Sequence, residues 1–242
     1  MAADPTTKYR RPPQPAQKQP MPGKTEDMRP TPDHGEATYR GSGKLRDVVA
    51  LITGADSGIG RAVAIAFARE GADIVFAYLS EDEDAEETVE WVEKAERRAI
   101  AVRGDIQDEG FCNELVARTV SELGRIDCLV NNAAHQASFE SIEDISAEEF
   151  DLTFRTNVYA MFYLCKAAIP RMKPGSTIIN TTSINFKQPS PQLLAYATTK
   201  GAIANFTGGL AGLVADKGIR VNAVAPGPVW TPLIPSTMPE EK

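Results

Sequence analysis

The sequence predicts an α/β protein in three layers, with a doubly wound parallel sheet between two layers of helices. Three observations predict this fold class. Short apolar runs alternate with longer helical patterns from about residue 44 onward, which is typical of a parallel sheet covered on both faces. Right-handed crossovers make such a sheet doubly wound. A chain of 242 residues, 42% of them hydrophobic, is sufficient for one such domain.

Each predicted strand is followed by a helical pattern or a turn. Apolar runs predict strands at residues 48–52, 74–79, 99–102, 128–130, 177–180 and 221–224. Helical patterns predict helices at residues 61–70, 80–95, 109–123, 148–171 and 196–214. Gly71 ends the first of these helices, and Ser80 with Glu83 forms a capping box that opens the second.

Residues 1–43 differ in composition from residues 44–242, which form the predicted domain. They hold eight of the 17 prolines and no Val, Ile, Leu, Phe, Trp or Cys. Such a segment buries too little apolar surface to offset the entropy lost on ordering. We therefore expect a proline-rich arm that is disordered or loosely draped. The alternative is an arm that packs on a neighbouring subunit, with Tyr9 and Tyr39 as anchors.

Composition excludes several classes of function. A net charge of -7 gives no nucleic-acid footprint, and no apolar run approaches the ~20 residues that span a membrane. The N-terminus shows no signal peptide. The cysteines, Cys112, Cys128 and Cys165, are odd in number and lack metal-type spacing, which fits a reducing cytoplasm. His34 and His135 lie far apart, so we expect no metal site.

A glycine-rich turn, TGADSGIG at residues 53–60, follows the first predicted strand and opens the first helix. Its glycines permit a tight turn and close approach to a pyrophosphate, for which the helix N-terminus supplies unpaired N–H groups. A glycine pattern alone is weak, and an ordinary turn is the alternative. The strand–turn–helix setting favours a Rossmann-type dinucleotide site.

Candidate catalytic residues lie farther along the chain. Tyr196 and Lys200 are four residues apart on one predicted helix and so share a face. An ammonium beside a phenol lowers the phenol pKa from its usual ~10, which suits proton exchange with an alcohol. Ser183, which follows the fifth predicted strand, is a further candidate, although a serine at this position could simply cap a helix or turn. Asn157 lies within a predicted helix, where asparagine has poor propensity, so its presence there needs an explanation. A buried structural hydrogen bond would be a sufficient one.

These residues lie in register with four further motifs: the T-G-x-x-x-G-x-G spacing, Asp105-Ile106, residues 131–134 (NNAA) and residues 226–229 (PGPV). All lie at or after predicted carboxyl ends of strands, where open α/β sheets bind ligands. Together they resemble the single-domain branch of the short-chain dehydrogenase/reductase family. The arm, residues 33–36 (DHGE) and residues 225–232 are similar to bacterial glucose/ribitol-dehydrogenase-like, general-stress oxidoreductases.

The resemblance implies roles for the catalytic residues. Tyr196 is the general acid/base, Lys200 lowers its pKa and binds the nicotinamide ribose, Ser183 polarises the carbonyl, and Asn157 supports the proton relay. The implied cofactor contacts are Gly54, Ser57, Gly58, Ile59, Gly60, Tyr78, Asp105, Ile106, Asn132, Ala133, Ala134, Tyr196, Lys200, Pro226, Gly227, Val229 and Thr231. The candidate substrate contacts are Ser183, Gln136, Asn185, Gln192 and Trp230.

The implied function is hydride transfer between NAD(P)(H) and the carbonyl or alcohol of a small aldehyde, sugar or polyol. One alternative is a 3-oxoacyl-thioester reductase. Another is a non-catalytic NAD(P)-sensing module, which would have no need of the four catalytic residues. The cofactor is NAD or NADP. Tyr78 stands where NAD enzymes carry a carboxylate, which favours NADP slightly, whereas the acidic run from Glu81 favours NAD.

The chain stops at Lys242, within what resembles the family's substrate-binding loop. Family members continue through a further helix and a seventh strand, so the last strand is expected to be missing. An exposed apolar edge would then be an aggregation risk. If the chain is complete, the resemblance implies a cytoplasmic homo-oligomer, a homotetramer.

Overall fold

A computed structural model describes residues 13–239. Its sheet has six parallel strands in the order β3-β2-β1-β4-β5-β6, which confirms the predicted doubly wound topology. The strands are β1 (Val49–Thr53), β2 (Asp73–Tyr78), β3 (Ala99–Arg103), β4 (Cys128–Asn131), β5 (Thr177–Thr181) and β6 (Arg220–Val224). In the register, Leu51 of β1 lies between Val75 of β2 and Leu129 of β4.

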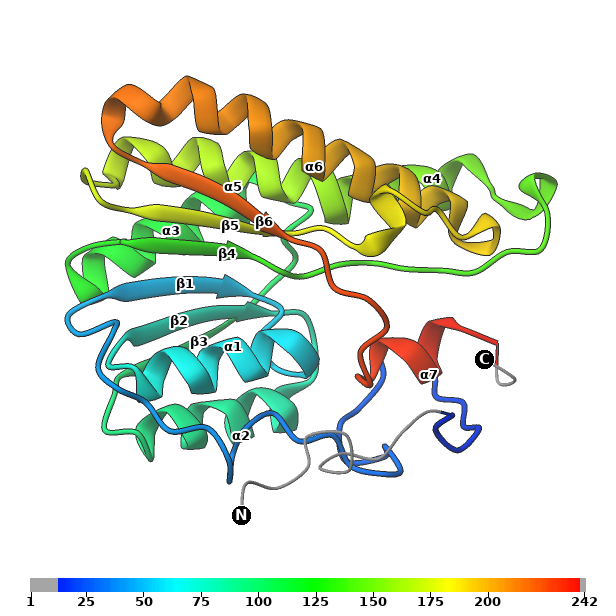
Figure 1. The fold of residues 1–242 in the computed structure, drawn as a ribbon, viewed down its shortest axis with the longest axis horizontal. Helices are drawn as coiled ribbons and strands as arrows, with labels where there is room; N and C mark the ends of the chain where they lie inside the picture. The colour runs from blue at the N-terminus through cyan, green and yellow to red at the C-terminus, as the bar shows by residue number, and fades with distance from the viewer. Residues whose placement is uncertain (1–12, 240–242) are drawn as a thin grey trace, which may run out of the picture.

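Helices cover both faces of this sheet (Figure 1). The α-helices are α1 (Gly58–Arg69), α2 (Asp82–Glu93), α3 (Glu109–Leu123), α4 (Ala147–Phe154), α5 (Ala160–Ala168), α6 (Leu194–Val214) and α7 (Leu233–Thr237). Short 3-10 helices span Ile142–Asp144, Ile169–Arg171, Ile184–Phe186, Pro191–Leu193 and Ala215–Lys217. Among the described residues, no helix is long and apolar enough to cross a membrane.

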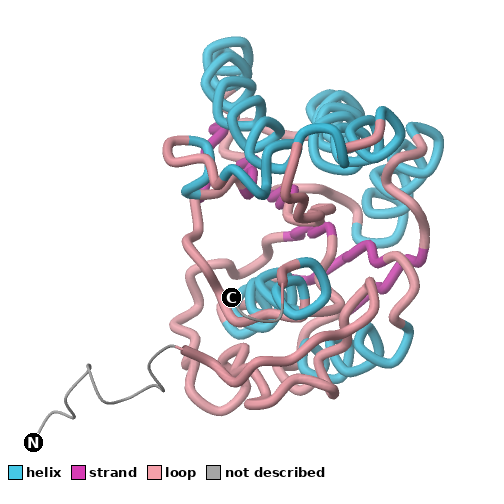
Figure 2. The backbone as a smooth tube through the Cα atoms, turned by 90° about the vertical axis from the view of Figure 1, so that its right-hand side faces the viewer, coloured by secondary structure: helices cyan, strands magenta, loops and turns pink. Residues whose placement is uncertain are grey.

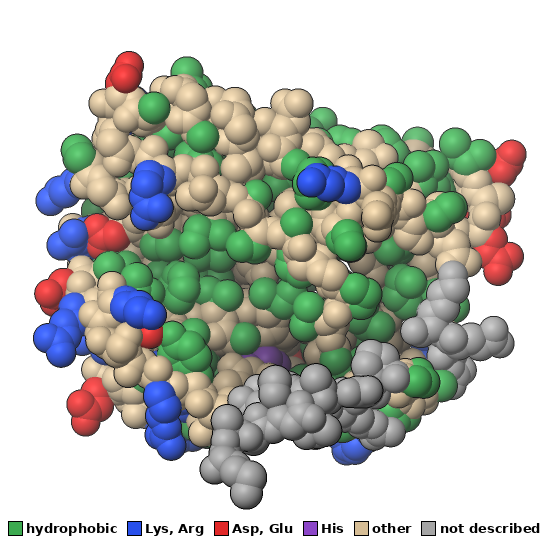
Figure 3. All heavy atoms as spheres, in the orientation of Figure 1, with side chains coloured by type: hydrophobic (Ala, Val, Ile, Leu, Met, Phe, Trp, Pro, Cys, Tyr) green, Lys and Arg blue, Asp and Glu red, His purple; other side chains and the backbone are tan. Residues whose placement is uncertain are grey.

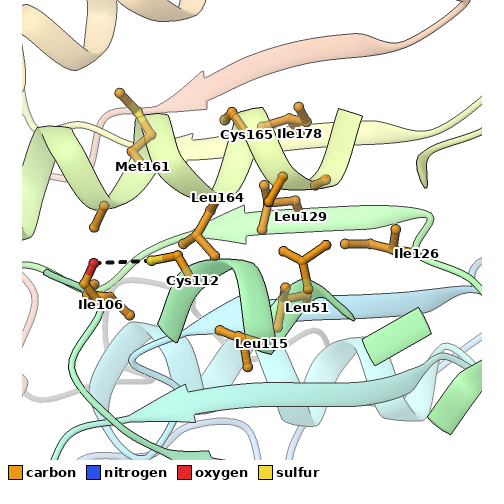
Figure 4. Close-up of a cluster of buried hydrophobic side chains, with 14 of the residues drawn as sticks. Leu51, Ile106, Cys112, Leu115, Ile126, Leu129, Met161, Leu164, Cys165 and Ile178 are labelled. Carbon is orange, nitrogen blue, oxygen red and sulfur yellow. Dashed lines mark hydrogen bonds between the residues drawn. The ribbon is translucent and has the colours of Figure 1, made fainter. Parts of the chain in front are cut away.

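Two apolar clusters, one on each face, hold the layers together. Side chains alternate along a strand, so Leu51 enters one cluster while Ile52 enters the other. The first cluster packs the sheet against α3, α5 and α6, and Figure 4 shows Cys112 within it. The Cys112 thiol donates to the Ile106 carbonyl oxygen at 3.2 Å. All three cysteines are free and buried, so they serve as packing residues.

Two predicted helices differ from those observed. Helix α2 begins at Asp82 after Glu81, and no side chain caps it; the Ser80 hydroxyl donates to the Glu81 carboxylate instead. The predicted capping box is therefore wrong. The predicted helix at residues 148–171 is divided, because a π-helical turn, Arg155–Tyr159, separates α4 from α5. Such turns occur often at functional sites.

The described part of the arm, residues 13–43, lies against the domain without forming a helix or strand (Figure 2). The Arg69 guanidinium donates to the carbonyl oxygens of Gly35 and Tyr39, and the Tyr39 hydroxyl donates to Glu70. Met28 is completely buried. Tyr39 thus contacts its own chain, and its alternative role as an anchor on a neighbouring subunit stays untested, whereas Tyr9 lies outside the described residues.

One edge of the sheet is open within residues 13–239. Strand β6 ends the sheet there, and four of its five residues are exposed. Apolar side chains gather across the middle of the face shown in Figure 3, between α6 above and the arm below. Val224 of β6 is 47% exposed. The edge strand thus presents unpaired backbone groups beside apolar surface.

Candidate active site

The candidate residues lie where the strands end. All six strands point in one direction, and their carboxyl ends face the side of the molecule where α7 lies (Figure 1). Figure 2 looks onto this side, where loops and the arm gather. Loops at the carboxyl edge of a doubly wound sheet are where such folds bind ligands. The sheet topology therefore brings together residues that are distant in sequence.

Tyr196 and Lys200 occupy successive turns of α6, and both are buried, with 9% and 1% of their surfaces exposed. The Lys200 ammonium lies 5.0 Å from the centre of the Tyr196 ring. It donates a hydrogen bond of 2.9 Å to the Thr181 carbonyl oxygen at the end of β5. Helical spacing and the end of β5 thus hold the amine against the phenol ring.

Burial shifts the pKa values of both groups. It raises the pKa of Tyr196, and a hydrogen bond with the Ser183 hydroxyl offsets part of that rise. It lowers the pKa of Lys200 to about 7. The sequence predicted a lowered Tyr196 pKa, and this was wrong for the protein alone because desolvation disfavours the phenolate. The site instead contains an amine that titrates near neutral pH.

Ser183 follows β5 and lies beside Tyr196. Its hydroxyl also accepts hydrogen bonds from the backbone and side-chain amides of Asn185, at 3.2 and 3.3 Å. Ser183 therefore caps the short helix at Ile184–Phe186, as the alternative interpretation expected, and still faces the phenol. The role of Ser183 as a helix cap and the role implied by the resemblance, polarising the carbonyl, are therefore compatible.

Asn157 joins the π-helical turn to the loop after β4. Its side-chain oxygen accepts from the His135 N–H at 2.7 Å, and its amide donates to the His135 carbonyl oxygen at 2.9 Å. The same amide donates to the Thr199 hydroxyl at 3.0 Å, one residue before Lys200. A buried asparagine with three such bonds explains its presence in an unfavourable helical position. Its side chain ties that loop to α6.

The glycine-rich turn is packed too closely to accept side chains at its glycines. A Cβ atom on Gly54, where φ is +64°, would lie 3.0 Å from the Ala133 Cα. One on Gly60 would lie 1.9 Å from the Gly54 carbonyl oxygen. Helix α1 begins beside this turn with no side-chain cap and no acidic residue in its first turn. Its unpaired N–H groups fit the pyrophosphate of a dinucleotide.

The loop after β4 lies against this turn. The Thr53 hydroxyl accepts from the backbone amides of Asn132 and Ala133, at 3.0 and 3.1 Å. The Asn132 side-chain amide donates to the carbonyl oxygens of Thr53 and Gly54. Gly58 packs closely against Thr231 from the segment after β6. The structure therefore brings three of the predicted cofactor-binding segments together.

The ends of β2 and β3 form the adjoining part of the site. The Tyr78 hydroxyl donates to Asp82 at 2.8 Å, and the Arg103 guanidinium bonds the other oxygen of that carboxylate. Tyr78 and Arg103 are partners in the strand register. The Asp105 carboxylate accepts from Gln107 in the loop after β3, where Ile106 is nearly buried. These residues surround the position expected for the adenosine.

Several residues predicted from sequence lie in the remaining loops. The buried Gln136 amide donates to the Thr237 hydroxyl of α7 at 2.7 Å, and the Gln192 carbonyl oxygen accepts from Phe139. The Trp230 indole donates to the Pro30 carbonyl oxygen of the arm. The other predicted residues lie at the start of α1 (Ser57 and Ile59), after β4 (Ala134) and after β6 (Pro226, Gly227 and Val229). The indole N–H of Trp230 is thus already engaged by the arm.

Sequence reasoning missed two features of this region. The His135 ring bonds Glu149 of α4 at 2.8 Å, beside the backbone that Asn157 holds. Arg61, the residue after the glycine-rich turn, is completely buried and bonds Asp84 and Glu87 of α2. A basic residue directly after such a turn, followed by an acidic helix, was the available signal.

Comparison with known proteins agrees with this geometry. The family model described as short chain dehydrogenase matches residues 48–242. General stress protein 39 of Bacillus subtilis (strain 168) is 55% identical over 221 residues, which cover 91% of this chain and 77% of that protein. The glucose and ribitol dehydrogenase of Daucus carota is 48% identical over 94% of this chain and 80% of its own length.

Solved structures show the same architecture. A short chain dehydrogenase from Burkholderia cenocepacia J2315, in complex with NADP, superposes with a TM-score of 0.77 at 34% identity, over 80% of this chain and 79% of that one. One from Mycobacterium paratuberculosis, bound to NAD, gives 0.75 at 35% identity, over 79% and 76%. From its sequence, its site and these likenesses, the chain belongs to the short chain dehydrogenase family of NAD(P)-dependent oxidoreductases.

Proposed function

We propose that this enzyme moves a hydride between NAD(P)(H) and the carbonyl or alcohol of a small aldehyde, sugar or polyol. One observation carries the proposal: Tyr196, Ser183 and Lys200 converge, all buried, at the carboxyl edge of the sheet that also bears the glycine-rich turn. The named activities of two relatives support the substrate class. They are the glucose and ribitol dehydrogenase of Daucus carota and the NADPH-dependent aldehyde reductase 1 of Arabidopsis thaliana, the latter 47% identical.

In this proposal the bound cofactor supplies or accepts the hydride, and the protein positions and polarises the reacting groups. The Tyr196 hydroxyl donates its proton to the carbonyl oxygen during reduction. The Ser183 hydroxyl holds the same oxygen, since it already lies beside the phenol. Lys200 binds the nicotinamide ribose and favours the phenolate that remains after proton transfer. Asn157 positions the loop after β4 and supports the proton relay.

The cofactor-binding assignment follows the three segments that meet at the turn. The helix α1 N-terminus and Gly54, Gly58 and Gly60 would hold the pyrophosphate. Of the two cofactors we favour NADP. Tyr78 ends β2 without a carboxylate, and Arg103 lies beside it in the register. The acidic residues Glu81 and Asp82 are the opposing feature, and the affinities for NADH and NADPH decide between the two cofactors.

We also propose a cytoplasmic homo-oligomer, and a homotetramer in particular. Several exposed aromatic side chains lie on α4, α5 and the turn between them: Phe150, Tyr159 and Phe162, each at least 40% exposed. Contiguous apolar surface of this kind marks protein interfaces. Sedimentation velocity of the purified chain tests this assembly, and a monomer at micromolar concentration would contradict it.

A second candidate function is the reduction of a 3-oxoacyl thioester. It is favoured by likeness to a 3-ketoacyl-(acyl-carrier-protein) reductase from Brucella melitensis complexed with NADH, with a TM-score of 0.74 at 33% identity. A non-catalytic NAD(P) sensor is the third. It is disfavoured because a sensor needs neither the buried amine nor the phenol. Substrate profiling separates the three.

The test begins with fluorescence titrations of the purified chain with NADH and with NADPH. Turnover is then measured with a panel of short aldehydes, glucose, ribitol and a 3-oxoacyl thioester. We expect saturable binding of one cofactor and turnover of an aldehyde or polyol, with Tyr196→Phe as the inactive control. If a cofactor binds but no member of the panel is turned over, the sensor is favoured. Absence of binding to both cofactors would contradict all three candidates.

A further inference from the structure

Helix α7, which lies in the segment after β6, is held by loops and by the arm. The Gln136 amide donates to the Thr237 hydroxyl, and the Ser138 hydroxyl donates to the Thr237 carbonyl oxygen. In Figure 1, α7 stands apart from the sheet on the side where the strands end. A five-residue helix in that position depends on its neighbours for its placement.

Arm residues 18–30 hold this segment at several points. The Gln19 N–H donates to the Pro235 carbonyl oxygen at 3.0 Å, and the Lys18 ammonium donates to that of Met238 at 2.9 Å. Before the helix, the Trp230 indole donates to Pro30 at 2.8 Å. Between these points the arm backbone touches the helix start so closely that a Cβ on Gly23 would lie 2.5 Å from the Pro232 oxygen.

Residues 18–30 also contact α2, which lies beside the glycine-rich turn. The Thr25 N–H donates to one oxygen of Asp84 in α2 at 3.2 Å, and the Arg61 guanidinium bonds the other at 3.0 Å. Arg61 also donates to the Asp56 carbonyl oxygen in the glycine-rich turn at 2.8 Å. Thr25 and Asp84 are both buried. A continuous chain of buried and partly buried hydrogen bonds therefore joins the turn to the arm.

We propose that residues 18–30 form a strap that positions α7 beside the loop after β4, on the side where the strands end, and that Arg61 and Asp84 couple the strap to the glycine-rich turn. This inference rests on the proposed function. Arg61 and Asp84 are positioning residues, because they act through the strap. A dinucleotide that orders the turn then orders α7, and α7 held in place strengthens dinucleotide binding to the same extent.

Hydrogen exchange of the full chain, with and without NADPH and in parallel with NADH, tests the strap. Ligand should slow exchange in residues 53–61 and also in residues 230–239, the latter by about 5-fold or more, the lower bound for typical coupling. Gly23→Ala places a methyl group against Pro232 without touching the turn. In this variant, protection of residues 230–239 should be lost, while that of residues 53–61 remains.

Gly41→Ala is the matched control, because its methyl group meets the Arg69 carbonyl oxygen and loosens the arm at α1 rather than at α7. It should keep ligand protection of residues 230–239. Thr25→Pro removes the N–H bonded to Asp84, together with the Thr25 hydroxyl, and should act like Gly23→Ala. It replaces Gly23→Ala if that variant does not fold. With an aldehyde that turns over, both strap variants should raise KM more than they lower kcat.

Three outcomes would overturn the strap. One is equal protection of residues 230–239 in wild type, Gly23→Ala and Thr25→Pro. Another is protection confined to residues 53–61 in the wild type, which leaves the proposed function intact and removes only the coupling. The last is no protection of residues 53–61 by either cofactor, which contradicts the proposed function and the strap together.

Discussion

Two buried cations, Arg61 beside the glycine-rich turn and Lys200 in the proposed catalytic centre, differ in how their charge is satisfied. Arg61 bonds two carboxylates, those of Asp84 and Glu87, as well as two carbonyl oxygens. Within residues 13–239, Lys200 has a single hydrogen bond, to the Thr181 carbonyl oxygen. Both side chains are almost wholly buried, with 0% and 1% of their surfaces exposed. Their surroundings differ, and of the two only the lysine can lose its charge when buried.

The difference separates a structural charge from a reactive one. A buried charge surrounded by carboxylates stays charged and holds its partners in place, and removing it leaves those partners unpaired. A buried amine without a carboxylate is destabilised as an ammonium, which is why the pKa of Lys200 falls to about 7. Perturbed groups of this kind cluster at functional sites. The following changes test how far this contrast extends, beginning with the largest expected effect.

The largest effect is expected in the catalytic region. Tyr196→Phe removes the proton donor, and general acid/base catalysis contributes about 10²–10⁴-fold, so kcat should fall by that amount. Cofactor affinity should change little, because the ring and Lys200 remain. Steady-state kinetics and a cofactor titration on the same preparation measure both quantities. A variant with near wild-type kcat would show that another group moves the proton.

Arg61→Met should destabilise the fold, because it leaves Asp84 buried without its cation. Breaking a buried ion pair in this way costs about 3–5 kcal/mol of unfolding free energy. The matched control is Arg118→Met, which removes an exposed pair with Glu122 and should cost about 0–1 kcal/mol. Urea unfolding of both variants measures the difference. Equal losses would remove the distinction between the two kinds of cation.

Lys200→Met should have the opposite effect on stability from Arg61→Met. It should abolish turnover but raise the free energy of unfolding by about 1–2 kcal/mol. The folded pKa of Lys200 is about 7 and its usual value is 10.5, so the unfolded chain binds more protons between those limits. Wild-type stability should therefore rise with pH from 7 to 10.5 relative to the variant. Thermal melts of both proteins at several pH values in that window measure this, and parallel curves would refute it.

The smallest effect is expected at Asp56 in the glycine-rich turn. Desolvation raises the pKa of this carboxyl to about 6 from 3.8, so its charged form costs stability that increases as the pH rises from 3.8 to 6. The shift corresponds to about 3 kcal/mol for a fully desolvated group, but Asp56 is only partly buried and solvent screens its charge. Asp56→Asn should therefore stabilise the protein at pH 7 by about 1 kcal/mol, and by less at pH 5. Chemical unfolding at the two pH values checks the sign. Greater stabilisation at pH 5 would contradict the assigned cause.

Local pattern was sufficient to predict the sheet and the proximity of Tyr196 and Lys200. The first strand was expected at residues 48–52 and lies at Val49–Thr53, because a buried parallel strand is a continuous apolar run. Tyr196 and Lys200 lie close together because helical spacing alone sets their relation. These features depend on neighbours in sequence, which a single chain displays.

The features that could not be predicted depend on tertiary contacts. The basic residue after the turn and the acidic helix were a signal for Arg61, but its burial and its partners, Asp84 and Glu87, more than twenty residues away, depend on tertiary packing. Helix α7 has five residues, one of them Pro235, so no periodicity reveals it. The expected lowering of the Tyr196 pKa was wrong because sequence shows proximity but not desolvation. Burial, the decisive quantity in each case, arises only on folding.

The difference in charge between Lys200 and Arg61 is tested most directly by an NMR titration of the chain labelled with ¹³C at the lysine Cε positions. The Lys200 resonance is assigned by its absence from Lys200→Met. If Lys200 is the buried amine without a carboxylate partner described above, its resonance should titrate with a midpoint near pH 7. A midpoint near 10.5, the ordinary value for lysine, would show that its charge is as well satisfied as that of Arg61 and would contradict the distinction.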